Sequence, residues 1–301
     1  MEEKHVELGN DRISLKATAA ESGVSINLRS AGTGFSYAEG RCVYRLSKRT
    51  GEGILLGEGL KDVHLDIVDQ KCTVVGNLLG LEITHQLECD QKSHRIAECI
   101  SIANPGRSEE TLIDFAFGLT RPIANSVGTV HPDLRNDRFV AIPFRHTPMD
   151  EADFNLDFAV EDLIRTPGRM QRTGPGPLEY PLRGFVAASY WVSEGWAWSR
   201  EGEVLLVSAF SQERMFWSTI APEFEPEETL LRFGGASMAT LDPHSPLVLP
   251  PGGSLSLGVV HYEIAQGGLN QAYYAFRSLL DENGCRFPPG YDPPVHWNEL
   301  Y

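Results

Sequence analysis

Alternation of apolar and polar residues dominates the first part of the chain. Val63, Leu65 and Ile67 are separated by aspartate and histidine, and the same period of two runs over 81–89 and 113–119. Successive side chains of a strand point to opposite faces, so this alternation predicts antiparallel strands with one buried face. Turn sequences such as Asn104-Pro105-Gly106 separate the predicted strands.

The stretch 121–183 breaks this pattern, because prolines and glycines recur and alternation is scarce. We expect mainly ordered loop there, with one short helix around Val160 to Arg165 and a strand from Phe139 to Phe144. Loops of this length in a compact domain are usually functional or form interfaces.

Strand patterns then resume. The predicted strands are Phe185 to Val192, Trp196 to Arg200, Glu203 to Phe210, Met215 to Ile220, Thr229 to Phe233 and the stretch 254–264. In the last stretch the apolar phase changes, which predicts a β-bulge near Gly258. So many strands exceed what one open sheet holds, so we predict two large antiparallel sheets packed face to face.

One amphipathic helix is predicted from Gly268 to Asn283, with Gly284 as its left-handed stop. A proline-rich connector follows, and then an apolar, aromatic segment with the sequence PPVHWNELY at 293–301. A strand in that position would expose its edge and one face. We therefore expect this segment to need partners from a further domain.

Composition narrows the function classes. A 301-residue chain with 42% hydrophobic residues can bury a large core. Its net charge of -15 repels phosphate backbones and anionic lipid, so we expect neither nucleic acid nor membrane as a partner. A neutral sugar fits this charge better, although an acidic balance of this size more often serves solubility alone. The five cysteines form no CxxC pair and no secretory leader is evident, which favours reduced thiols and a cytoplasmic protein.

The sequence lacks the common short motifs of metal-binding, dinucleotide-binding and nucleophilic catalytic sites. It contains no HExxH, no dinucleotide-type glycine motif and no GxSxG, so we predict no metal, no cofactor and no catalytic residue in this chain. Trp196 and Trp198 share one strand face and could form a sugar platform, although inter-sheet core is the more usual role.

The loop run from His131 to Arg138 concentrates charge within the long excursion. Its candidate site residues are Asp133, Arg135, Asp137 and Arg138. They could hydrogen-bond a sugar or contact a neighbouring domain through salt bridges, and we favour a structural or domain-contact role.

The order of a long strand-rich region, a PGGSLSLG strand, one helix, a proline-rich connector and an aromatic segment resembles the melibiase-type α-galactosidases. In sequence the resemblance is strongest over Leu249 to Tyr301. The resemblance implies a mainly β fold in which residues 1–265 form a galactose mutarotase-like supersandwich, that is, two large antiparallel sheets packed face to face. A linker helix and connector at 266–292 would follow, and 293–301 would be the truncated first strand of a (β/α)8 catalytic barrel.

The family hydrolyses α-glycosides with retention, using two carboxylates on later barrel strands. The resemblance therefore implies an inactive accessory domain that packs against the catalytic barrel of the same polypeptide, shapes its cleft and supports homo-oligomer formation. It also implies sugar contacts, carried over to Trp297, Asn298, Glu299 and Tyr301, although packing of Trp297 in a strand layer, with frayed last residues, is the more usual outcome. The turn reads His-Trp-Asn-Glu, where many relatives have Trp-Glu or Trp-Tyr, so no sugar is assigned.

Two alternatives stay open. A free-standing sugar mutarotase or aldose epimerase would use the same fold with a histidine and a carboxylate as acid and base. A carbohydrate-binding sandwich module would use exposed aromatic residues instead. Segment 266–301 favours the accessory domain over the free-standing enzyme, because such an enzyme needs no terminal helix, connector and aromatic tail.

Overall fold

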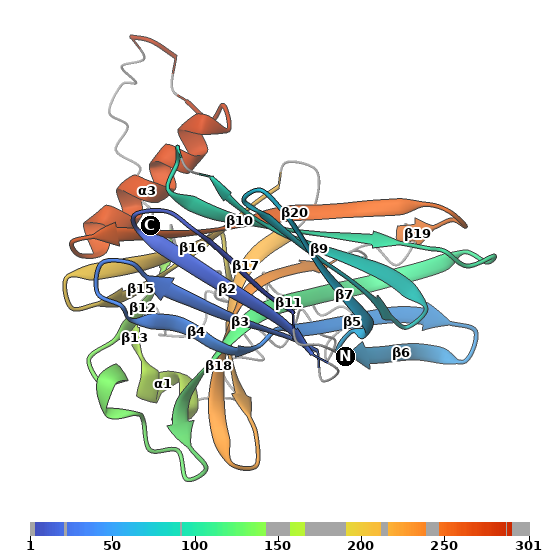
Figure 1. The fold of residues 1–301 in the computed structure, drawn as a ribbon, viewed down its shortest axis with the longest axis horizontal. Coiled ribbons are helices and arrows are strands. Elements are labelled where there is room, and N and C mark those ends of the chain that lie inside the picture. The colour runs from blue at the N-terminus through green and yellow to red at the C-terminus, as the bar shows by residue number, and fades with distance from the viewer. Residues whose placement is uncertain are drawn as a thin grey trace, which may run out of the picture.

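The computed structural model describes residues 4–20, 23–90, 92–142, 157–165, 191–211, 216–238, 247–286 and 288–290. Strands dominate these residues and pair antiparallel throughout. They form two packed layers, with a helix, α3, lying against one of them (Figure 1). The predicted mainly β, two-layer supersandwich is confirmed.

One layer is a nine-stranded sheet, which we call the large sheet, in the order β13-β12-β15-β16-β20-β10-β9-β8-β7. Its strands are β7 (Lys61–Val68), β8 (Lys71–Leu78), β9 (Leu81–Asp90), β10 (Arg95–Ala103), β12 (Arg138–Ile142), β13 (Asp157–Ala159), β15 (Gly195–Arg200), β16 (Glu203–Phe210) and β20 (Ser254–Gln266).

The second layer contains two sheets that pack on the same face of the large sheet. The seven-stranded second sheet has the order β14-β17-β18-β11-β5-β6, with β19 pairing to β11, and the small sheet has the order β1-β2-β3-β4. The second sheet comprises β5 (Val43–Thr50), β6 (Gly53–Glu58), β11 (Glu110–Asn125), β14 (Trp191–Ser193), β17 (Phe216–Phe224), β18 (Glu228–Met238) and β19 (Leu247–Leu249). The small sheet comprises β1 (Lys4–Gly9), β2 (Ile13–Ala20), β3 (Gly23–Ser30) and β4 (Ser36–Arg41).

Period-two alternation builds the core between the layers. In β9 every second residue from Leu81 to Cys89 is buried, as the sequence predicts. These side chains face Tyr44 of β5 and Phe117 of β11, both 1% exposed. Ring contacts continue along this interior, for example between Phe117 and Phe216 at 6.1 Å. One continuous core therefore joins all three sheets.

The predicted bulge near Gly258 is confirmed. Cys99 pairs with Val259 and Ser101 with Ser256, so two residues of β20 lie opposite one residue of β10. A Cβ atom on Gly258 would lie 2.3 Å from Phe216 Cδ1, which explains why glycine occupies the bulge. The bulge thus lets the aromatic ring of Phe216 pack against the β20 backbone.

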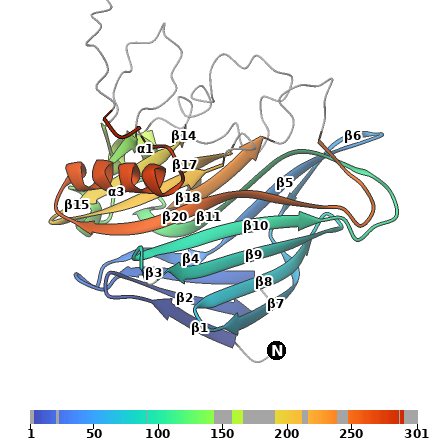
Figure 2. The ribbon, with the colours of Figure 1, turned by 90° about the horizontal axis from the view of Figure 1, so that it is seen from above.

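The predicted helix is α3 (Leu269–Glu282), and Gly284 after it has a φ of 84°. Its apolar side, including Ala272 and Phe276, packs on the outer face of the large sheet (Figure 2). Arg95 of β10 donates to Glu282 at 2.5 Å, which ties the helix to the sheet. The short helix α1 (Val160–Arg165) also lies at its predicted position.

Three expectations need correction. Strand β11 runs through the predicted loop start to Asn125, because Pro122 lies beside a register shift, where a ladder hydrogen bond is dispensable. In β7 only Leu65 of the three alternating residues is fully buried, since β7 is a sheet edge, and Ile67 is 41% exposed. Residues 132–134 form a 3-10 turn rather than loop.

Several predictions fall outside the described residues. These are the aromatic segment 293–301, the first part of the predicted strand at 185–190, and residues 143–144 of the strand that the structure places at Arg138–Ile142. Among the helices that the structure describes, none is both long and apolar enough to cross a bilayer.

Candidate functional site

The charged loop 131–138 is held at one end of the sandwich by arginines from two strands. Asp133 in the 3-10 turn accepts a hydrogen bond from Arg121 of β11 at 2.9 Å. Asp137 accepts one from the Trp198 indole at 2.7 Å and lies 3.6 Å from Arg200. The two aspartates thus bind groups that are distant in sequence. Burial raises the pKa of Asp137, and the Trp198 hydrogen bond opposes that rise.

A ring and a second carboxylate complete this end cluster. The guanidinium carbon atoms of Arg121 and Arg200 lie 4.3 and 3.2 Å from the centre of the Phe35 ring. The fully buried Glu203 accepts hydrogen bonds from Ser30, Thr33 and Tyr37 at 2.8 to 2.9 Å. Burial, and then the Glu203 charge, raise the pKa of the Tyr37 hydroxyl. A largely buried polar network therefore connects the small sheet to the large one.

The two arginines of the loop lie elsewhere. Arg135 is exposed and lines a cavity of about 360 Å³ together with Glu161 and Ile164 of α1. Arg138 is the exposed first residue of β12. Cavities of this volume fall in the range of small-molecule sites. Of the four predicted loop residues, the structure brings Asp133 and Asp137 together with arginines and places Arg135 in a polar pocket.

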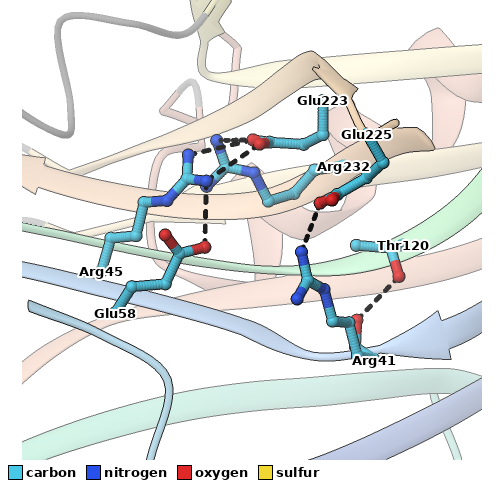
Figure 3. A network of polar contacts seen from close by, with 7 residues as sticks. All are labelled: Arg41, Arg45, Glu58, Thr120, Glu223, Glu225 and Arg232. Carbon is cyan, nitrogen blue, oxygen red and sulfur yellow. Dashed lines mark hydrogen bonds and ion pairs between the residues drawn. The ribbon is translucent and has the colours of Figure 1, made fainter. Parts of the chain in front are cut away.

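A second cluster lies on the outer face of the second sheet, which the sequence did not indicate. Arg45 of β5 donates to Glu223 of β17 at 2.9 and 3.1 Å and to Glu58 of β6 at 3.0 Å. Arg232 of β18 reaches the same Glu223 carboxylate at 2.6 Å. Figure 3 shows both guanidinium groups converging on Glu223. We call these four residues the outer-face network.

Burial governs the electrostatics of this network. Burial, together with the charge of Arg45, lowers the pKa of the fully buried Arg232. Burial raises the pKa of Glu223, and Arg45 opposes that rise. A neighbouring pair, Arg41 and Glu225, joins the face beside Thr120, whose hydroxyl donates to the Arg41 carbonyl at 2.7 Å (Figure 3). Each carboxylate already has a guanidinium partner, so the network mainly fixes four strands relative to one another.

The structure also contains a histidine and carboxylate pair of the kind that acid and base catalysis uses. His85 Nε2 lies 2.7 Å from Glu98, and His85 Nδ1 lies 2.6 Å from the Tyr44 hydroxyl. Tyr262 donates to the other Glu98 oxygen at 2.5 Å. His85 is 1% exposed and Glu98 is 0% exposed. This pair lies between the layers, so a sugar cannot reach it without separation of the sheets.

The remaining predicted site residues divide clearly. Trp196 and Trp198 are 1% and 2% exposed, which confirms the core interpretation and excludes a sugar platform there. The four residues carried over from the family resemblance, Trp297, Asn298, Glu299 and Tyr301, lie outside the described residues. Among the residues that the structure describes, no three His, Cys, Asp or Glu side chains gather closely enough to hold a metal ion.

Comparison with known proteins gives similarity in structure alone. No protein-family model matches the sequence, and no curated protein sequence matches it. The α-galactosidase AgaA of glycoside hydrolase family 36 from Geobacillus stearothermophilus, solved as a variant with 1-deoxygalactonojirimycin, superposes with a TM-score of 0.52 and 12% identity. This match covers 92% of the chain and 42% of AgaA.

Two further structures agree. Another AgaA variant, solved with stachyose, has 14% identity and a TM-score of 0.52 over 92% of this chain and 42% of its own. A putative aldose 1-epimerase from Escherichia coli K12 has 9% identity and a TM-score of 0.50, over 88% of this chain and 100% of its own. At this identity the similarity shows the fold, a galactose mutarotase-like supersandwich. The chain spans about two fifths of the α-galactosidases that it matches.

Proposed function

We propose that this chain is the non-catalytic supersandwich domain of an α-galactosidase-like glycoside hydrolase, and that it packs against a catalytic barrel of the same polypeptide. The observation that carries the proposal is the position of His85 and Glu98, which are sealed between the layers. A sandwich that used this pair on a sugar would have to present it to solvent.

The shared fold is compatible with an accessory domain and with a free-standing epimerase. The environment of His85 and Glu98 distinguishes these two functions. The same supersandwich forms part of AgaA and the whole of the putative aldose 1-epimerase. In this chain His85 is hydrogen-bonded to Tyr44, and Glu98 accepts a hydrogen bond from Tyr262. Polar groups that are sealed inside a core and hydrogen-bonded there contribute to stability and to the spacing of the layers rather than to turnover.

The helix α3 supports the domain contact. It lies on the outer face of the large sheet, and its Tyr273 and Tyr274 are 38% and 67% exposed. Neighbouring tyrosines that offer an apolar ring and a polar hydroxyl are typical of interfaces. We propose that the barrel contacts this side of α3.

A second candidate, sugar binding without catalysis, is favoured by the cavity beside α1. Its Arg135 and Glu161 can donate to and accept from sugar hydroxyls. Calorimetric titration with galactose, raffinose and stachyose tests it. Arg135→Ala should abolish any heat of binding, whereas Arg49→Ala, at an exposed arginine of β5 outside the cavity, should leave it unchanged.

The primary proposal is tested by expressing the 301-residue chain and, in parallel, the gene product read beyond Tyr301. We expect the chain alone to release no nitrophenol from nitrophenyl α-galactoside and other nitrophenyl α-glycosides, and the longer product to hydrolyse at least one of them. Tyr274→Ser should weaken the contact between this domain and the barrel. The melting temperature of the longer product should therefore fall, whereas that of the isolated 301-residue chain should stay unchanged.

Hydrolysis by the 301-residue chain itself would contradict the proposal. So would a reading frame beyond Tyr301 that encodes no alternation of strands and helices.

A further inference from the structure

Strand β6 is the edge of the second sheet, and its apolar side chains are exposed. Among the described residues it pairs with β5 alone. Its three consecutive apolar residues, Ile54, Leu55 and Leu56, are 41%, 44% and 57% exposed. Natural edge strands are usually protected by charge, proline or a covering segment, and an uncovered apolar edge marks a site where another strand pairs.

The sequence around this edge reads the same in both directions. Residues 51–59 are Gly-Glu-Gly-Ile-Leu-Leu-Gly-Glu-Gly, which is symmetric about Leu55 apart from the exchange of Ile54 and Leu56. The monomer accounts for part of this pattern: Gly53 and Gly59 have φ values of 138° and 75°, and a Cβ on Gly57 would collide with Leu79 at 2.5 Å. The exposed apolar centre has no such explanation.

We propose that two copies of this chain pair through antiparallel β6 strands, with a two-fold axis at Leu55. A two-fold interface uses the same patch on both copies, so residue i must fit residue j and the reverse. In this register Leu55 faces Leu55 of the second copy, and Ile54 faces its Leu56. The two second sheets then form one continuous sheet across the dimer.

Charge and area limit the strength of this pairing. Glu52 would lie opposite Glu58 of the second copy at both ends of the paired strands, which repels, and Arg45, bound to Glu58 at 3.0 Å, offsets part of this repulsion. Pairing of two six-residue edges with their side chains buries roughly 1,000 Å² in total, which is near the lower limit for a specific interface. The dimer is therefore weak and depends on protein concentration.

The position of β6 leaves room for a second copy. Figures 1 and 2 both place β6 at the periphery, at the opposite end of the sandwich from α3. A partner strand can thus approach the free edge of β6 without contact with α3.

Sedimentation velocity of the 301-residue chain over a wide concentration range tests the proposal. We expect a shift from one to two chain masses as concentration rises, and loss of the dimer in Leu56→Lys. The matched control is Val127→Lys, because Val127 is 82% exposed but lies in a turn of the second sheet. Circular dichroism checks that both variants keep the fold.

Cross-linking tests the register independently. In a Cys285→Ser background, Leu55→Cys should form a disulfide-linked dimer under mild oxidation, whereas Val127→Cys should not. A wild-type chain that stays monomeric, a dimer that survives Leu56→Lys, or open-ended polymers would overturn the proposal. Protection of β6 amides from hydrogen exchange in a strictly monomeric chain would overturn it as well, by assigning the edge to a partner within the chain.

Discussion

Replacement of His261 by glutamine tests how the outer face of the large sheet responds to pH. His261 lies in β20, on the same strand face as Glu263 and Ala265, and its Nδ1 atom is buried with no hydrogen-bond partner among the described residues. Burial, and then the positive charge of Arg95, lower the pKa of His261 from 6.5 to about 4, and the charges of Glu282 and Asp90 oppose this shift.

The sign of the effect follows from proton binding. Below pH 6.5 the unfolded chain binds a proton at His261 that the folded chain binds only near pH 4, so acid favours unfolding over this window. The stability is present above pH 6.5 and is lost as pH falls toward 4. At about pH 5 the loss from this residue amounts to about 2 kcal/mol.

Urea unfolding at neutral pH and at about pH 5 measures this loss. The wild type should lose about 2 kcal/mol more than His261→Gln between the two conditions. The matched control, His5→Gln, removes an exposed histidine of β1 and should leave the wild-type dependence intact. The reasoning is refuted if wild type and His261→Gln lose the same free energy. The raised pKa values of Asp137 and Glu223 act in the opposite direction and cancel in this difference.

Three further predictions concern the packed interior, each measured by chemical unfolding with fold checked by circular dichroism. Gly234→Ala should destabilise by about 1–3 kcal/mol, because its Cβ would lie 2.5 Å from the Phe117 carbonyl; an unchanged stability would mean that the strands separate freely. Glu98→Ala should cost about 2–4 kcal/mol, since it leaves the buried His85 Nε2 without its carboxylate partner; a smaller cost would place water in that interior. Glu223→Gln should cost about 3–5 kcal/mol, since the buried Arg232 loses its counter-charge and the half-buried Arg45 keeps only Glu58; a neutral effect would contradict the outer-face network.

Much of the fold could be predicted from the sequence because the signals are local. Strand β16 has the predicted bounds, Glu203–Phe210, since a single apolar run between turns defines it. The change in phase of the apolar alternation near Gly258 predicted a bulge, against which Phe216 packs. The apolar residues at three- and four-residue spacing predicted the helix α3 and its buried face. In each case the pattern depends on neighbours within a few residues.

The clusters could not be predicted, because their partners are distant in sequence. Asp133 and Asp137 bind Arg121 and Arg200 of other strands, and no spacing rule connects these positions. The edge strand β6 has three consecutive apolar residues without alternation, so the period-two criterion does not detect it. Which strands lie at a sheet edge is a property of topology rather than of local pattern.

The central proposal is that this sandwich, which buries His85 and Glu98 in its core, performs no sugar chemistry by itself. Polarimetry of freshly dissolved α-D-galactose and α-D-glucose with the 301-residue chain tests it most directly. The account predicts that each sugar relaxes at the rate measured in buffer, at every protein concentration. A relaxation rate that rises in proportion to the chain would contradict it.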